Sequence, residues 1–107
     1  MQNIYFVFTS SELSLREYII TDPDLTSFDL KVDITRRKNR RPGWSSISSY
    51  DSDIYGAIKI FWHTRTHMLE CVINTRNEND HKPIWDLFEQ YLRQQFGDEI
   101  IEVKKVK

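Results

Sequence analysis

The stretch from Gly56 to Arg76, GAIKIFWHTRTHMLECVINTR, most constrains the fold of this chain. Apolar and polar residues alternate along both of its halves, and side chains two residues apart in a strand share a face. The apolar residues of one parity are Ile58, Ile60, Trp62, Leu69, Cys71 and Ile73. A polar turn near Thr64 and Arg65 would fold the two halves into an antiparallel hairpin that has all six on one face.

The position of the turn predicts the hairpin register. A turn between residues 64 and 65 sets Ile60 against Leu69, which pairs apolar with apolar. The next pair is Lys59 with Glu70, which pairs a cation with an anion. A slip by one residue would scramble both faces, so we expect a well-specified register. The turn lacks the Asn-Gly or Gly-X pair of the tightest hairpins, so a four-residue loop is the alternative.

The N-terminal third predicts two strands and a short helix. Residues 3–9, NIYFVFT, carry apolar side chains on both parities, as in a central strand covered on both faces. Within residues 10–20, Ser14 and Glu17 have the spacing of a capping box, which favours a short helix. Residues 27–35 alternate cleanly and predict a strand with one solvent-exposed face.

The C-terminal part predicts a long helix followed by an edge strand. Asp80 is placed as a helix cap, and Gly97 suits the helix end. Between them an apolar stripe at helical spacing would pack on the sheet; its residues are Ile84, Leu87, Phe88, Tyr91 and Leu92. Residues 100–107 end in VKKVK, which is typical of an edge strand protected by lysines.

These elements predict a single α+β domain that spans residues 1–107. We expect a mainly antiparallel sheet of four or five strands, one long amphipathic helix on one face and a short N-terminal helix. The 39% apolar and 29% charged residues suit a packed protein and argue against intrinsic disorder. The single cysteine, Cys71, is expected to be a buried, inert thiol in a reducing compartment.

The same sequence predicts a soluble, cytoplasmic protein. No apolar run approaches the roughly 20 residues needed to cross a bilayer. The chain begins with a strand-like MQNIYFVFT instead of a basic region followed by an apolar core. We therefore expect no membrane partner.

A basic loop is the strongest candidate site. Residues 36–55 show no sustained periodicity, and so long a loop in a small domain is usually functional or partly disordered. The candidate binding residues are Arg36, Arg37, Lys38, Arg40, Arg41, Trp44 and Tyr50. Such cations bind phosphates and such rings stack on bases, yet arginine, tryptophan and tyrosine also dominate protein interfaces. The pattern indicates a binding surface without naming the partner, and a solvated charge run is the alternative.

A secondary acidic surface is expected on the long helix. Asp86 and Glu89 lie on its polar side, within a segment where acids outnumber cations. An acidic face can attract a basic protein, although an ordinary solvated helix face is the alternative.

The sequence offers no recognisable catalytic or cofactor motif. It has no glycine-rich phosphate loop, no Gly-x-Ser-x-Gly and no Cys-x-x-Cys. His63 and His67 flank the predicted turn, but no nearby residue completes a metal-binding set, so we expect them to be solvated. His81 is expected to be a solvated residue in the first turn of the helix. No cofactor and no metal are expected.

We therefore expect a small non-catalytic, intracellular protein-binding domain. Its most concrete version is an inhibitor or immunity-type protein that binds and neutralises a toxin. The alternative is an RNA-binding domain that uses the basic and aromatic loop over residues 36–50. A third hypothesis is a small ribonuclease that uses His63 or His67.

Overall fold

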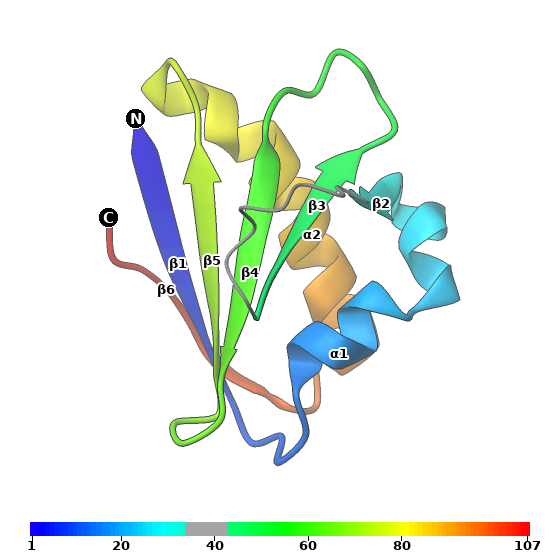
Figure 1. Ribbon diagram of the computed structural model, residues 1–107, viewed down its shortest axis with the longest axis vertical. Helices are drawn as coiled ribbons and strands as arrows, with labels where there is room; N and C mark the ends of the chain where they lie inside the picture. Colours follow the sequence, from blue (N-terminus) through cyan, green and yellow to red (C-terminus); the bar gives the residue numbers. More distant parts are fainter. Residues whose placement is uncertain (34–42) are drawn as a thin grey trace.

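The computed structural model describes residues 1–33 and 43–107, which form one antiparallel sheet with helices on one face (Figure 1). Its elements are β1 (Gln2–Thr9), α1 (Leu15–Ile20), a 3-10 helix η1 (Pro23–Phe28), β2 (Leu30–Val32), β3 (Trp44–Ser49), β4 (Ala57–His63), β5 (Met68–Asn74), a second 3-10 helix η2 (Glu78–Asp80), α2 (His81–Phe96) and β6 (Ile100–Lys105). The strand order is β2-β3-β4-β5-β1-β6, and every neighbouring pair is antiparallel. The α+β class is confirmed, but the described residues form six strands instead of four or five.

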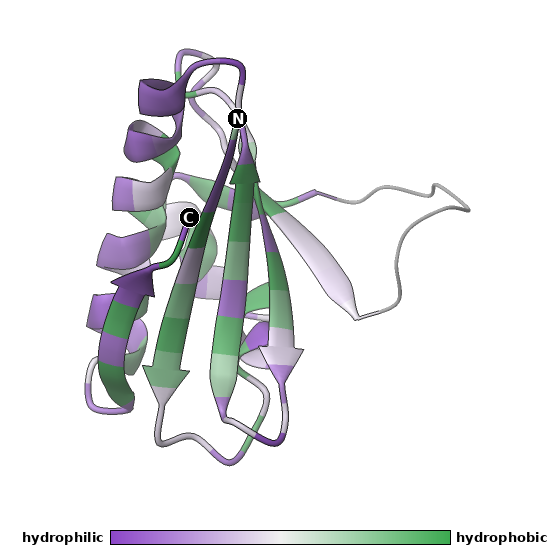
Figure 2. Cartoon of the chain, turned by 90° about the vertical axis from the view of Figure 1, so that its left-hand side faces the viewer, coloured by the Kyte–Doolittle hydropathy of each residue, from purple (hydrophilic) through white to green (hydrophobic). Residues whose placement is uncertain are grey.

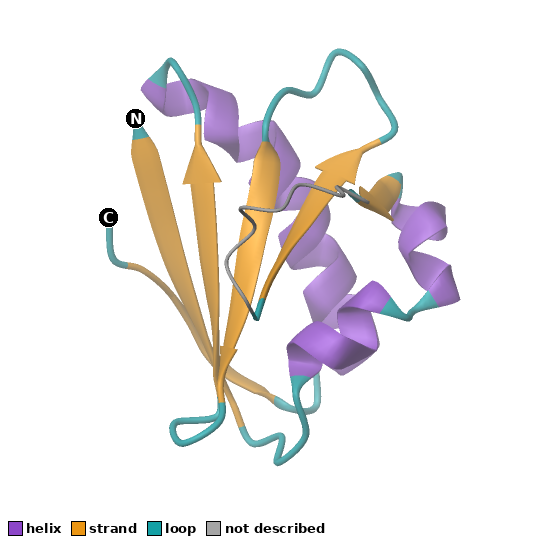
Figure 3. Ribbon diagram, viewed as in Figure 1, coloured by secondary structure: helices purple, strands orange, loops and turns teal. Residues whose placement is uncertain are grey.

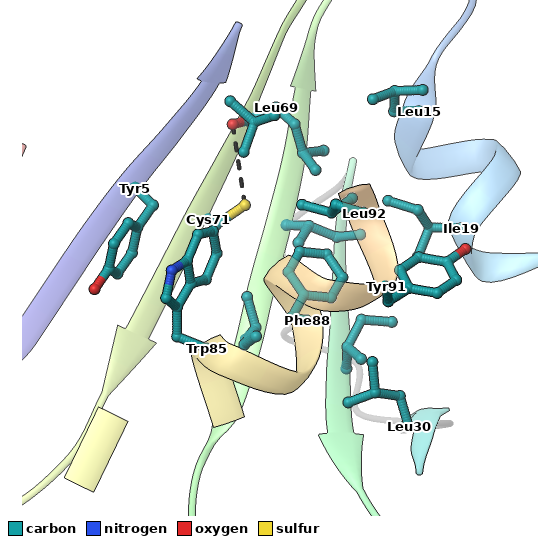
Figure 4. Close-up of a cluster of buried hydrophobic side chains, with 14 of the residues drawn as sticks. Tyr5, Leu15, Ile19, Leu30, Leu69, Cys71, Trp85, Phe88, Tyr91 and Leu92 are labelled. Atoms are coloured by element: carbon teal, nitrogen blue, oxygen red, sulfur yellow. Dashed lines mark hydrogen bonds between the residues drawn. The ribbon is translucent and has the colours of Figure 1, made fainter. Parts of the chain in front are cut away.

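The helices that the structure describes all pack on the same face of the sheet. Figure 2 shows α2 along one face, and in Figure 3 α2 runs behind β3 and β4. Leu15 and Ile19 of α1 are fully buried in the same core as Phe88 and Leu92 of α2 (Figure 4). No described helix is long and apolar enough to cross a membrane.

The predicted hairpin is confirmed as β4 and β5, but its register differs by two residues. Ile60 lies opposite Cys71 instead of Leu69, because the turn is the four-residue loop 64–67 and not a two-residue turn. His67 closes this loop with a positive φ of 53°. An offset of two preserves parity, so the six apolar residues predicted to share one face are all buried.

The predicted strand over residues 27–35 is mostly wrong. Only Leu30–Val32 form a strand, while Phe28 belongs to η1 and residues 34 and 35 lie outside the described part. The cause is local: Asp22 accepts a hydrogen bond from Asp24 N, and a proline occupies the first turn, so a 3-10 helix starts here. Asp29, in the left-handed conformation, then turns the chain into β2.

Strand β3 occupies residues that we expected to be loop. The segment WSSISS lacks the apolar alternation of a strand, because four of its six residues are serines. Serine hydroxyls of this strand form hydrogen bonds with side chains from other parts of the chain. Ser45 accepts a hydrogen bond from Arg16 at 2.9 Å. Ser46 and Ser48 donate to the two carboxylate oxygens of Asp33, at 3.0 and 2.6 Å. These bonds let a polar segment lie in the sheet.

The helix boundaries agree with the sequence except at one cap. Ser14 Oγ accepts a hydrogen bond from Glu17 N at 3.2 Å, as the capping box predicts. Asp80 makes no capping bond, because η2 runs directly into α2 and the chain is already helical there. The helix ends at Phe96, immediately before the predicted Gly97.

Candidate binding surface on the open face of the sheet

The sheet face opposite the helices carries apolar, aromatic and polar side chains, most of them half-buried; Met68 and Val72 are buried, and Lys59 is exposed. We call it the open face. Its residues alternate with the core residues of each strand: Trp44, Ser46 and Ser48 of β3, Lys59, Phe61 and His63 of β4, Met68, Glu70 and Val72 of β5, and Ile4, Phe6 and Phe8 of β1. Because β1 is only half-buried on this side, the expectation that it is covered on both faces is wrong.

One row of the open face is aromatic. The register places Trp44, Phe61, Glu70 and Phe6 side by side across β3, β4, β5 and β1. The rings of Trp44 and Phe61 are 5.2 Å apart between centroids, and Phe6 meets Phe8 edge to face at 6.2 Å. The row therefore presents rings on two sides of a single carboxylate.

Gly43 lets Phe61 lie close to the backbone at the edge of this row. Its φ of 84° suits glycine, and a Cβ there would come within 2.8 Å of the Phe61 ring. Gly43 thus makes room for an aromatic side chain immediately before β3.

A histidine and a carboxylate form the polar part of the open face. His63 Nε2 lies 2.8 Å from Glu70 Oε1, and the His63 ring packs edge to face on Phe61 at 4.9 Å. His63 is therefore not the solvated turn residue that we expected. Each side chain thus satisfies a polar group of the other, so that both can lie among the aromatic rings.

Charges around the open face balance. Three lysines, Lys31, Lys59 and Lys104, have the parity of this face. Three carboxylates, those of Asp33, Glu70 and Glu102, lie on the same side. Among the described residues the rim is thus a mixture of both signs and not a basic patch.

The predicted binding residues are divided by the structure. Arg36, Arg37, Lys38, Arg40 and Arg41 lie outside the described residues. Trp44 is on the open face at the start of β3, whereas Tyr50 follows the other end of the same strand. Tyr50 is 56% exposed, and Lys31 Nζ lies 5.3 Å from its ring centre. The two predicted aromatics therefore do not form one cluster.

The predicted acidic surface lies on α2, on the opposite side of the sheet from the open face. Asp86 is 3.5 Å from Lys82, and Glu89 is 2.9 Å from Arg93, each pair one helical turn apart. Such surface pairs add little stability. They do offset the negative charge on which the predicted attraction depends.

The other two histidines have structural contacts. His67 Nδ1 donates to the carbonyl of Ser11 at 2.6 Å, which ties the hairpin loop to the segment after β1. His81, expected to be solvated, is only 5% exposed. Its Nδ1 donates to a backbone carbonyl at 2.5 Å, so its Nε2 accepts from the Tyr5 hydroxyl at 2.9 Å. No group of three or more His, Cys, Asp or Glu residues in the described part could hold a metal ion.

Sequence reasoning missed Phe6, Phe8 and Phe61 as surface residues. The pattern that could have found them is an aromatic residue on the parity opposite the core, which occurs in both β1 and β4. In β1 this pattern suggests a strand covered on both faces, although one covered and one half-exposed face gives the same pattern.

No protein-family model matches this chain, and no curated protein matches it either.

Proposed function

We propose that this chain is a non-catalytic protein-binding domain whose docking surface is the open face of the sheet. The observation that carries the proposal is the half-buried aromatic row of Trp44, Phe61 and Phe6 on a face that no described helix covers. Interface centres are enriched in aromatic residues and surrounded by a polar rim. Both features are present on this face.

The balance of charge favours a protein as the partner. Among the described residues three lysines and three carboxylates surround the aromatic row, and the whole chain has a formal net charge of −1. A rim of mixed sign selects a partner with a complementary pattern and repels others. On the described part of this face, a phosphate backbone would instead meet carboxylates as often as lysines.

Neutralisation of a toxin is the narrower form of this proposal. A small rigid face can block a toxin by covering its active site or its own binding surface, and needs no chemistry of its own. If the captured partner is a toxic enzyme, we expect its activity to be lost in the complex. Trp44→Ala should restore it.

The test compares two faces of the same domain. Tagged chain with Trp44→Ala, or with Asp86→Lys and Glu89→Lys together, is cross-linked in its native cells, and bound proteins are quantified against wild type. Removing a buried indole from an interface costs about 2 kcal/mol or more, roughly a 30-fold loss of affinity. The α2 variant is the matched control, because its residues lie on the opposite side of the sheet.

The pattern of binding by the two variants shows which face holds the site. A partner kept by the α2 variant and lost with Trp44→Ala supports the open face. A partner lost with the α2 variant and kept with Trp44→Ala would move the site to the acidic helix and refute the proposal.

RNA binding is the second candidate, because aromatic rings on neighbouring strands of an antiparallel sheet can stack with bases. Trp44 and Phe61 lie opposite each other on the neighbouring strands β3 and β4. Fluorescence anisotropy with single-stranded RNA at 50–200 mM salt tests this. Binding through phosphates weakens steeply with salt, and the removal of any one of the five loop cations (Arg36, Arg37, Lys38, Arg40 and Arg41) should lower the salt slope by a little under one unit.

A ribonuclease gains less support from the geometry. His63 and His67 are held by different partners, Glu70 and the Ser11 carbonyl, so they do not form one acid/base couple. RNA cleavage by the pure protein that disappears with His63→Ala would nevertheless replace the non-catalytic proposal.

A further inference from the structure

The outer edge of β6 has backbone groups without a strand partner among residues 1–33 and 43–107. Strand β6 pairs on one side with β1 and ends the sheet. Val106 N donates to Ile4 O at 2.8 Å, so even-numbered residues of β6 direct their N–H groups towards β1. Because these groups alternate along the regular part of the ladder, Val103 and Lys105 direct theirs outwards, whereas Ile101 lies at the register shift beside Phe8 and Thr9.

The hydrogen bonds of β1 independently confirm which residues of β6 direct their backbone groups towards β1. Thr75 N donates to Met1 O, and Met1 N donates to Thr75 O, so the odd-numbered residues of β1 bond to β5. Its even-numbered residues are then left to bond to β6. This alternation determines which residues of β6 have outward backbone groups that can pair with a further strand.

Of the antiparallel registers centred on residues 102, 103 and 104, one lets β6 pair with a second copy of itself without opposing like charges. Odd residues must face odd residues, so the centre lies on one residue and not between two. A centre on Glu102 opposes two glutamates, and a centre on Lys104 opposes two lysines. A centre on Val103 instead sets Glu102 of each copy against Lys104 of the other. Centres nearer the ends pair fewer residues.

The side chains suit this register as well. Glu102 and Lys104 would form non-hydrogen-bonded pairs, in which opposing side chains are closest. Ile101, which is 71% exposed, would lie against the aliphatic part of Lys105 from the other copy. Val103 would face its own copy on the twofold axis.

We propose that the chain forms a symmetric homodimer by antiparallel pairing of β6 with β6, centred on Val103. The dimer is isologous, and the twofold axis stands perpendicular to the sheet. The two six-stranded sheets then continue as one of twelve strands, with both helical layers on one side. This inference does not depend on the function proposed above.

Charge reversal tests the register directly. Sedimentation equilibrium of the full chain between 10 µM and 1 mM should show a reversible dimer. Glu102→Lys alone and Lys104→Glu alone each set like charges against each other, so each should raise the dimer dissociation constant at least tenfold. An equimolar mixture of the two variants restores both attractive pairs and should form heterodimers as readily as wild type.

A backbone test separates strand pairing from side-chain attraction. Lys105→Pro removes an outward N–H but no bond to β1, and the Lys105 side chain is exposed. It should weaken the dimer while leaving the melting temperature of the monomer within a few degrees of wild type. Lys105→Ala, which keeps the N–H, is the control and should dimerise.

The proposal is refuted if the chain stays monomeric at 1 mM. A dimer that is indifferent to both charge reversals and to Lys105→Pro also refutes it, because another surface must then be responsible. Failure of the mixture to rescue dimerisation would refute the Val103 register.

Discussion

Consecutive residues of β4 should respond differently to truncation, since they lie on opposite faces of the sheet. Ile60 is fully buried between the sheet and the helices. Ile60→Ala removes three carbon atoms, worth about 0.8 kcal/mol each, and leaves a cavity that adds to the loss. We expect a loss of about 3 kcal/mol in the free energy of unfolding. For 107 residues this corresponds to a fall in melting temperature of about 13 °C.

Phe61→Ala removes a larger side chain but should cost less. Its ring is half-buried on the open face, so its removal leaves a surface depression and not an enclosed cavity. We expect about 1–2 kcal/mol, mainly from lost contact with Trp44 and His63. The same substitution should abolish partner binding, whereas Ile60→Ala should change binding little under conditions where the variant is folded.

Urea unfolding followed by circular dichroism measures both costs, with Lys59→Ala as the exposed control on the same strand. The control should lie within about 0.5 kcal/mol of wild type. A cost below about 0.5 kcal/mol for Ile60→Ala would mean that the faces of the hairpin are assigned wrongly. Equal costs for Ile60→Ala and Phe61→Ala would mean that the open face is enclosed in the folded protein.

Two further predictions concern groups that burial holds in their neutral form. Burial and a 2.7 Å hydrogen bond to Asp22 raise the pKa of Tyr91 above its usual 10, so the folded state keeps a proton that the unfolded state releases. The contribution of Tyr91 to the free energy of unfolding should therefore be fully present below about pH 10 and fall above it by up to about 1.4 kcal/mol per pH unit. Tyr91→Phe should flatten this slope in urea melts at pH 8–11. Burial likewise raises the pKa of the Cys71 thiol, so an aromatic disulfide reagent at pH 8 should label Cys71 only as fast as the protein unfolds; rapid labelling of the native protein would contradict this.

The parts of the fold that the sequence predicts correctly are those where apolar periodicity decides the structure. The buried face of the hairpin is predicted correctly despite a two-residue error in register, because the parity of a residue, and not its exact partner, decides whether its side chain is buried. The helix α2 and the cap of α1 at Ser14 followed from local chemistry in the same way.

The error at β3 occurs where tertiary contacts replace periodicity. Strand β3 is serine-rich, and its place in the sheet depends on Asp33 and Arg16, which lie 11 or more residues earlier in the chain. The error at Phe28 has a local cause, since the Asp22 cap starts a 3-10 helix, and from this helix Phe28 packs edge to face on Tyr91. The partners of the β3 contacts are 13 or more residues apart in the chain, so the periodicity of the strand itself does not reveal them.

The candidate site shows why aromatics on the second parity of a strand deserve a functional explanation. The core is complete without them, since the opposite parity of β1, β4 and β5 already supplies its buried residues. Phe6 and Phe61 could be threonine without opening a cavity, and threonine suits a half-exposed strand position equally well. We therefore expect the double variant Phe6→Thr and Phe61→Thr to fold cooperatively with at most about 3 kcal/mol lost, and to lose its partner. A double variant that does not fold would show that these rings serve the fold, and the open face would then carry no argument for binding.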